Sequence, residues 1–301
     1  MKKYLPSLLV VLICISVAVG LGWLFSLGSY DVLNPKGEIA RQQKSLLLFT
    51  LLLSAVVVVP VFFMLGLFAV KYRQGKKNPG KYMPEWSSNK ALESIWWGIP
   101  IVIIAVLAVI TWQTSHSLDP YRPIASSNKT LEVQVVALQW KWLFILPEYN
   151  IATLNYLPVP VDRPLHFSLS ADAPMSAFWV PSLGSQIYAM NGMSSQLNLI
   201  ANEPGTYKGY STNINGEGYA SMKFDVVATN EFEFDQAVAT ASASTEMLNE
   251  ASYVNLVKPE SVTARKSYVL ADSELYDRVI LKYMGMDHGA MTHETTKEGV
   301  E

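Results

Sequence analysis

The chain has 301 residues, of which half are hydrophobic and only 16% are charged, below the share of about a quarter found in soluble domains. A formal net charge of −2 argues against a nucleic-acid partner, whose phosphates call for a basic face. The single cysteine, Cys14, excludes an internal disulfide framework. These features favour a membrane protein that also has enough residues for a domain in water.

The first apolar run extends from Leu5 to Leu27 and follows two positive charges, Lys2 and Lys3. A basic start, an apolar stretch and small residues near its end are typical of a cleaved signal peptide. The run is also long enough to remain in the membrane as a helix with its lysines inside. Residues 1–28 are therefore expected to be either a signal peptide or a first membrane span.

Two further runs, Leu46 to Val70 and Ile95 to Trp112, contain no charged residue. A helix needs about 20 apolar residues to cross the hydrocarbon layer, and both runs are close to that length or longer. Pro60 and Pro100 interrupt them, which membrane helices tolerate when neighbouring groups satisfy the freed backbone. Residues 29–115 are predicted to form a transmembrane helical hairpin.

The loop between these runs is strongly basic. Its only acidic residue is Glu85, against Lys71, Arg73, Lys76, Lys77, Lys81 and Lys90. An excess of Lys and Arg keeps a short loop in the cytoplasm. Both ends of the hairpin then face outward, and the chain after about residue 115 is predicted to be extracytoplasmic.

From Leu131 onward the pattern changes to short strands. The run LEVQVVALQWKWLF alternates apolar and polar residues before it turns aromatic. Further strands are predicted at Leu165–Leu169, Ser195–Ile200, Thr206–Tyr210 and Ser221–Val227, between turns that contain Pro, Gly or Asn. Such a series is typical of an all-β sandwich or barrel of about 100 residues, which we assign to residues 116–229.

After Thr229 the chain becomes helical in character. Asp272 or Ser273 is expected to cap a helix with an apolar face formed by Leu275, Val279, Ile280 and Tyr283. The stretch Val238–Thr245 is expected to be a linker or the end of a short helix. Residues 230–301 are predicted to form a helical C-terminal extension that ends in a tail rich in Met and His.

Two segments, MSAFWVPSLGSQIYAM (175–190) and PGTYKGYSTNINGEGYASM (204–222), resemble the copper-ligand segments of subunit II of the haem–copper respiratory oxidases. In the cytochrome c oxidases of that family, a dinuclear copper site takes a His from the first segment. The second segment gives two Cys, a glutamate carbonyl, a His and a Met. In that order the positions fall here at Ser176, Ser211 and Asn215, Asn213, Tyr219 and Met222.

Only Met222 keeps a ligand type of the family. Copper of this kind needs thiolate or imidazole donors, and Cys14 lies in the distant N-terminal run. No metal site is therefore expected, and the missing ligands point to the quinol-oxidising branch. The residues 178–193 and 200–210 are similar to those of the cytochrome bo-type ubiquinol oxidases, which implies a cupredoxin-like Greek-key fold.

The resemblance implies subunit II of a proton-pumping ubiquinol oxidase of the aerobic respiratory chain, which oxidises quinol and reduces oxygen to water. Subunit I would hold the haems, the copper and the quinol site, and this chain no redox centre. The implied partners are subunits I, III and IV and membrane lipid, without cytochrome c. The implied location is the bacterial inner (plasma) membrane, with several spans and the C-terminal domain in the periplasm.

Glu93 lies in NKALESIWWGIP (89–100), a segment that resembles the family pattern in which this glutamate lies at the mouth of a proton-uptake channel of subunit I. Independently of the resemblance, a carboxylate at a helix start is favoured by the helix dipole. Near the bilayer edge it can also exchange protons with water. Glu93 is expected to serve proton entry, helix capping or both.

The aromatic run at Trp140 and Trp142 resembles the segment that helps bring electrons to copper in the cytochrome c oxidases. Without that copper, both rings are expected to pack against subunit I or the sandwich core. His116 is expected to be an interfacial residue and His166 a structural one.

The tail from Met284 to His293 mixes thioether and imidazole donors, which suit Cu(I). An alternative function is therefore a membrane-tethered copper-binding or copper-delivery protein. A third is a structural scaffold with no oxidase partner.

Overall fold

The computed structural model describes residues 30–72, 87–260 and 264–284, together with positions 16, 20, 22, 23 and 85. The chain divides into two compact units, one built on Ser45–Leu118 and the other on Asp31–Lys44 and the residues from Asp119 onward. Most of residues 1–28, most of the basic loop and the tail beyond Met284 lie outside the described residues.

The first unit is built on two long helices, α2 (Glu38–Lys71) and α3 (Lys90–Ser117). Both are long and apolar enough to cross a membrane, and none of the apolar stretch of either helix is buried within the structure. Pro60 and Pro100 lie inside the helices without ending them. The helices extend beyond the predicted runs because their polar ends continue the backbone hydrogen-bond pattern, whereas hydropathy marks only the apolar part.

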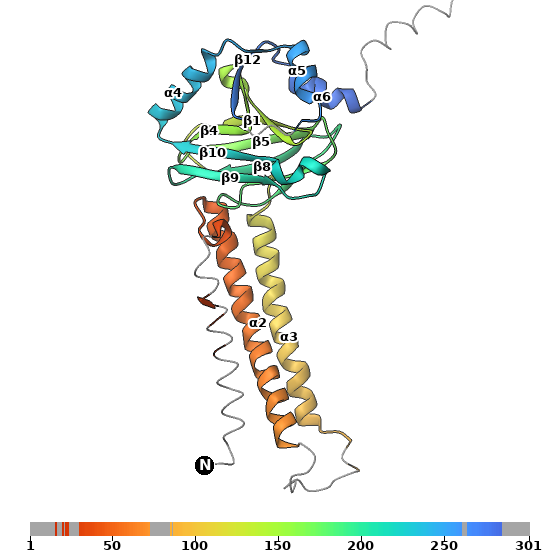
Figure 1. The fold of residues 1–301 in the computed structure, drawn as a ribbon. Helices are drawn as coiled ribbons and strands as arrows, with labels where there is room; N and C mark the ends of the chain where they lie inside the picture. Colours follow the sequence, from red (N-terminus) through yellow and green to blue (C-terminus); the bar gives the residue numbers. More distant parts are fainter. Residues whose placement is uncertain are drawn as a thin grey trace, which may run out of the picture. The chain divides into compact units, whose positions relative to one another are not determined.

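The second unit is a β sandwich (Figure 1). Its strands are β1 (Leu131–Leu138), β2 (Lys141–Leu146), β3 (Ile151–Leu154), β4 (Tyr156–Pro160), β5 (Pro164–Ala171), β6 (Ser176–Trp179), β7 (Ile187–Ala189), β8 (Ser195–Ile200), β9 (Gly205–Ser211), β10 (Lys223–Thr229), β11 (Met247–Leu248) and β12 (Lys266–Leu270). The larger sheet has the order β11-β12-β3-β2-β1-β5-β8 and the smaller sheet β4-β10-β9-β6-β7. The neighbours β1 and β5, and β4 and β10, run parallel, so the chain crosses between strands that are not consecutive.

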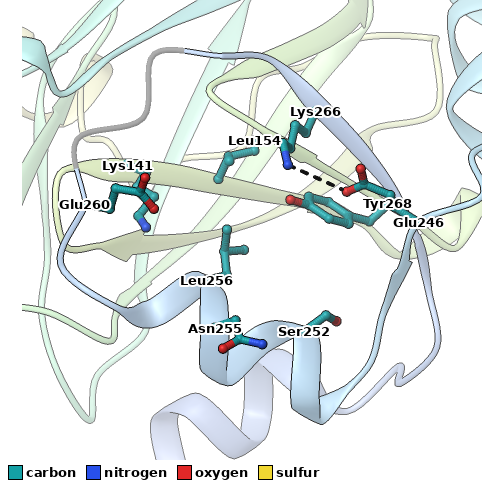
Figure 2. A pocket seen from close by; sticks show the side chains of 9 residues that line it. All are labelled: Lys141, Leu154, Glu246, Ser252, Asn255, Leu256, Glu260, Lys266 and Tyr268. Atoms are coloured by element: carbon teal, nitrogen blue, oxygen red, sulfur yellow. Dashed lines mark ion pairs between the residues drawn. The ribbon is translucent and has the colours of Figure 1, made fainter.

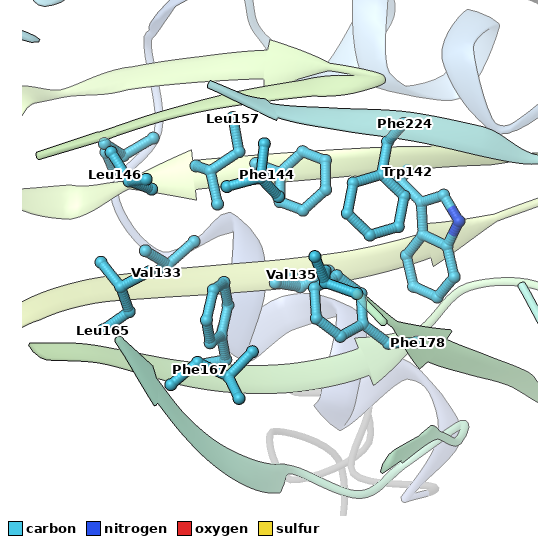
Figure 3. Close-up of a cluster of buried hydrophobic side chains, with 14 of the residues drawn as sticks. Val133, Val135, Trp142, Phe144, Leu146, Leu157, Leu165, Phe167, Phe178 and Phe224 are labelled. Carbon is cyan, nitrogen blue, oxygen red and sulfur yellow. The ribbon is translucent and has the colours of Figure 1, made fainter. Parts of the chain in front are cut away.

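Aromatic rings fill the space between the two sheets (Figure 3). Phe178 and Phe224 of the smaller sheet stack with their centroids 4.9 Å apart. Phe144 of the larger sheet meets both rings, at 6.3 and 5.2 Å. Successive residues of a strand face opposite sides, so Leu143 and Ile145 lie in a second core on the outer face of the larger sheet.

Part of the C-terminal extension belongs to the larger sheet. Besides the helices α4 (Glu231–Ser242), α5 (Glu250–Val257) and α6 (Leu275–Tyr283), it contains β11 and β12. Strand β12 pairs antiparallel with β3. The β structure therefore extends past residue 229, which corrects the predicted boundary and the expectation of an all-helical extension. Strands β11 and β12 are short and lie between helices, so their alternation of apolar and polar residues is too brief to predict a strand from the sequence.

The predicted helix caps need one correction. Neither Asp272 nor Ser273 caps α6: the capping position is Glu274, which makes no side-chain capping bond. Asp272 instead accepts a hydrogen bond from the backbone nitrogen of Glu274 at 2.9 Å and forms an ion pair with Arg278. Residues Val238–Ser242 form the end of α4, one of the two structures predicted for that stretch.

The segment before α2 is fixed to the sandwich. The backbone nitrogens of Lys36 and Gly37 donate to the carbonyl of Ser182, at 2.7 and 3.2 Å, and the carbonyl of Lys36 accepts from Asn202 at 2.9 Å. Lys36 also forms an ion pair with Glu203. The first turns of α2 therefore belong to the same compact unit as the β strands.

Candidate functional site

Three of the six positions at which the resemblance places copper ligands meet in one cluster. The side-chain amide of Asn215 donates to Ser176 Oγ at 2.8 Å and lies 3.5 Å from Met222 Sδ. Ser176 Oγ is also 4.0 Å from Met222 Sδ. Ser176 and Met222 are 0% and 1% exposed. The fold thus brings the two predicted segments together through Ser176 and Asn215, which are 39 positions apart in the sequence.

Asn213 lies in the loop after β9 that also carries Asn215, and its side chain holds this loop against strand β6. Its side-chain carbonyl accepts from the backbone nitrogen of Ala177 at 2.6 Å, and its amide donates to the carbonyl of Met175 at 2.6 Å. Ser211 Oγ lies 3.5 Å from the same Asn213 oxygen. Both groups of the amide are therefore used to hold one strand beside the other.

Tyr219 lies in a short 3-10 helix, η3 (Glu217–Ser221). Its backbone nitrogen donates to Gly216 at 3.2 Å, and its carbonyl accepts from Met222 at 3.0 Å. The position of the second family histidine thus serves here as part of a turn that leads Met222 back into the core.

This cluster does not fit a dinuclear copper centre. Its donors are hydroxyl, amide and one thioether, whereas soft copper requires thiolate or imidazole. The hydroxyl of Ser176 accepts from Asn215 and lies 3.2 Å from the carbonyl of Pro174, to which it donates. Ser176 Oγ thus has both a donor and an acceptor, whereas Asn215 Oδ1 is buried without a hydrogen-bond partner among the described residues.

Trp140 packs on the loop that carries Asn215. It occupies the left-handed region (φ 61°) in the turn between β1 and β2, a conformation that a bulky residue rarely adopts. A Cβ at Gly218 would lie 2.2 Å from its ring, and one at Gly216 3.2 Å away. Its indole nitrogen donates to the carbonyl of Asn215 at 3.3 Å. Glycine at both positions lets the ring lie flat against this loop.

Trp142 occupies a different environment. It is fully buried in the core of the sandwich. Its ring contacts Phe178 and Phe224 with centroid distances of 5.4 and 5.6 Å (Figure 3). The structure therefore places one tryptophan of the aromatic run in the core and the other on the loop.

Replacing Asn215 with Ala should lower the free energy of unfolding by about 1 kcal/mol, the usual contribution of a partly buried hydrogen bond. The change removes the donor to Ser176 Oγ. Urea unfolding of the purified chain measures the effect. A variant as stable as the wild type would contradict this role of Asn215 in the cluster.

Comparisons with known proteins agree on one family. Residues 148–229 match the family model described as cytochrome c oxidase subunit II, periplasmic domain. Cytochrome bo(3) ubiquinol oxidase subunit 2 of Pseudomonas putida is 42% identical over 280 residues, covering 91% of this chain and 89% of the relative. The chain belongs to the ubiquinol oxidase subunit 2 family. Ubiquinol oxidase subunit 2 of Acetobacter aceti is 42% identical over 84% of this chain and 82% of that one. Quinol oxidase subunit 2 of Bacillus subtilis is 38% identical over 86% and 78%.

Membership of the ubiquinol oxidase subunit 2 family confirms the predicted fold class, two apolar helices followed by a cupredoxin-like β sandwich. The two helices are compatible with the membrane anchor of an oxidase subunit. The same relatives do not favour the alternative of a copper-delivery protein.

In this family member Glu93 lies in the first turn of α3. The N-cap residue Asn89 accepts hydrogen bonds from the backbone nitrogens of Ala91 and Leu92, at 3.1 and 3.2 Å. Glu93 Oε1 accepts in return from the backbone nitrogen of Asn89 at 3.3 Å. The carboxylate therefore completes a capping arrangement, and its role in proton entry stays a prediction.

His166 and His116, for which the sequence predicted a structural and an interfacial role, each have partners nearby. His166 Nδ1 lies 2.9 Å from Asn198 Oδ1, and its ring is 3.9 Å from Glu132. The ring of His116 lies 4.5 Å from that of Trp112. Within the part of the chain that the structure describes, no group of three His, Cys, Asp or Glu residues is placed to hold a metal ion.

Sequence reasoning missed Asp172, which follows β5. Its side chain is 1% exposed. One oxygen accepts from Tyr253 OH at 2.9 Å, and the other from Lys282 Nζ and Tyr283 OH, both at 2.7 Å. These bonds tie α5 and α6 to the sandwich. The four residues follow no spacing that a sequence pattern could reveal, because they come from three separate elements.

Proposed function

We propose that this chain is the copper-free subunit II of a proton-pumping ubiquinol oxidase of the aerobic respiratory chain. The hydrogen-bonded cluster of Ser176, Asn215 and Met222 carries the proposal, since it occupies the positions where relatives that oxidise cytochrome c need metal ligands. Quinol oxidation and oxygen reduction then take place in subunit I, which holds the haems, the copper and the quinol site. This chain supports that subunit.

The basic loop between α2 and α3 supports a cytoplasmic position for that loop. The sandwich then lies in the periplasm of a bacterium, with the two helices in the inner membrane. Subunits III and IV of the oxidase and membrane lipid are the further partners of this arrangement. The apolar side chains exposed on both helices are suited to contact with lipid or with other membrane helices.

The electron donor tests this assignment. The intact complex should reduce oxygen with ubiquinol and not with reduced cytochrome c. The separated full-length chain should bind no copper in stoichiometric amount and show no near-infrared band of a mixed-valence copper pair. Oxidation of cytochrome c by the complex, or that band in the isolated chain, would overturn the proposal.

Replacing Glu93 with Gln tests proton entry. The amide keeps an oxygen that can accept from the backbone nitrogen of Asn89, so the helix cap is retained and the exchangeable proton is lost. We expect turnover to fall by about tenfold or more, as for a positioned proton-transfer group, with normal assembly. Oxygen uptake and proton release by the complex in vesicles measure the effect.

Glu85→Gln is the matched control, because Glu85 is the acidic residue of the loop before the same helix. That variant should turn over at the normal rate. Unchanged turnover and pumping in Glu93→Gln would limit Glu93 to capping.

A further inference from the structure

The C-terminal extension and the larger sheet line a cavity of about 440 Å³ that is open to solvent (Figure 2). This volume lies within the range of pockets for small molecules. Its lining comes from β2, β3, β12, α5 and the segments that flank them. None of the six former copper-ligand residues belongs to the lining, so the cavity is a separate feature of the domain.

A buried cation lines the cavity. Lys141 is the first residue of β2, and strand alternation places it on the face opposite Trp142. Lys141 is 1% exposed. Its ammonium group donates to the carbonyl of Lys258 at 2.9 Å, which among the described residues is its one hydrogen-bond acceptor. An ammonium group carries three donors, so this one has capacity for another acceptor.

The charge of Lys141 is incompletely balanced. Burial lowers the pKa of Lys141 below its ordinary value, and the attraction of Glu260 opposes part of that effect. Between the described residues, no ion pair within 4 Å joins Lys141 to a carboxylate. A buried ammonium is stabilised by an anionic hydrogen-bond acceptor. A negatively charged ligand oxygen would supply the anionic hydrogen-bond acceptor that no described residue of the protein provides for Lys141.

The remaining walls restrict the shape and charge of such a ligand. Leu154, Leu256 and Tyr268 give the cavity an apolar side. Lys266 and Glu246 form a 3.9 Å pair in which both side chains are about half exposed. Figure 2 shows that pair on one side of the cavity and Lys141 with Glu260 on the other. The two lysines and the two glutamates of the lining cancel in formal charge, so no group of the lining is left to balance a second negative charge on the ligand.

We propose that this cavity binds a small monocarboxylate with a short apolar tail. Its carboxylate accepts a hydrogen bond from Lys141, and its tail lies against Leu154, Leu256 and Tyr268. This site is independent of quinol oxidation, because the cavity belongs to the outer domain and contains no redox group among its described residues.

Equilibrium dialysis of radiolabelled hexanoate against the intact complex tests the proposal. Binding should saturate at one molecule per copy of this chain. Lys141→Met should weaken it by about tenfold or more, the loss expected for a hydrogen bond to a charged group. Lys266→Met, the matched control, removes an exposed lysine of the same cavity and should change affinity by less than about threefold.

Two measurements on the wild-type complex keep the test independent of how the variants fold. Hexanamide, which has the same shape without the charge, should fail to compete with hexanoate. Affinity for hexanoate should also fall as the pH rises through the lowered pKa of Lys141, because the cation is lost. Equal competition by hexanamide, equal affinity of Lys141→Met, or an absence of saturable binding would each overturn the proposal.

Discussion

Replacing Asp172 with Asn is expected to lower the free energy of unfolding by about 2–3 kcal/mol and to release the C-terminal extension. Hydrogen bonds to a buried charged acceptor each contribute about 1.5–3 kcal/mol, and Asp172 accepts three, from Tyr253, Lys282 and Tyr283. In the variant an amide N–H faces one of these donors, and the ammonium of Lys282 loses its partner. Urea unfolding and the rate of proteolysis between β10 and α6 measure the two effects.

Asp272→Asn is the matched control, since Asp272 is also an acid paired with a cation, Arg278, near the same helix. That pair is at the surface, and exposed ion pairs contribute about 0–1 kcal/mol. The amide keeps an acceptor for the backbone nitrogen of Glu274. Equal stability of Asp172→Asn and Asp272→Asn would show that the buried bonds do not hold the extension.

The contact made by Asp172 should also weaken at high pH. The hydrogen bond with Asp172 raises the pKa of Lys282 above its ordinary value of 10.5. A group whose pKa is higher in the folded state than in the unfolded state stabilises the fold fully at pH values below its unfolded-state pKa. That stabilisation is lost as the pH rises through the folded-state pKa. Protection of the extension from protease should therefore fall in the wild type above about pH 10.5. Protection that stays constant to higher pH would contradict this role of Lys282.

Replacing Gly37 with Ala should lower the free energy of unfolding by about 2–3 kcal/mol, a typical effect of overpacking a tight site. A Cβ there would lie 2.3 Å from the carbonyl oxygen of Ile200 and 3.0 Å from that of Leu183. Backbone atoms cannot move aside as a flexible side chain does, so the segment must leave its place. The hydrogen bonds to Ser182 are then lost. Unfolding of the full-length chain, followed by tryptophan fluorescence, measures this change.

Gly98→Ala provides the comparison for Gly37→Ala. A Cβ at Gly98 would meet nothing within 4 Å, and alanine is the better helix former by about 1 kcal/mol. That variant should be as stable as the wild type or more stable. If Gly37→Ala unfolds at the same urea concentration as the wild type, the segment before α2 is not held as described.

The pattern of the chain was enough to predict much of the fold. Strand β8 has the predicted bounds, and β9 and β10 differ from the predicted ends by one or two residues. The single run from Leu131 to Phe144 is two strands, because a turn at Gln139 and Trp140 reverses the chain. A tryptophan in the left-handed region gives no turn signal, since glycine or asparagine normally occupies such a position.

The sequence by itself determined which chemistry is absent from the former copper positions, because a side chain's donor type is fixed by its identity. It also determined the two long apolar helices, since hydropathy depends only on local composition. Only the tertiary structure decided that the amide nitrogen of Asn215 contacts both Ser176 and Met222. It also decided that Asp172 holds the extension and that Lys141 lines a cavity. Those contacts join residues from elements far apart in the chain, and a local pattern carries no information about which distant residues will meet.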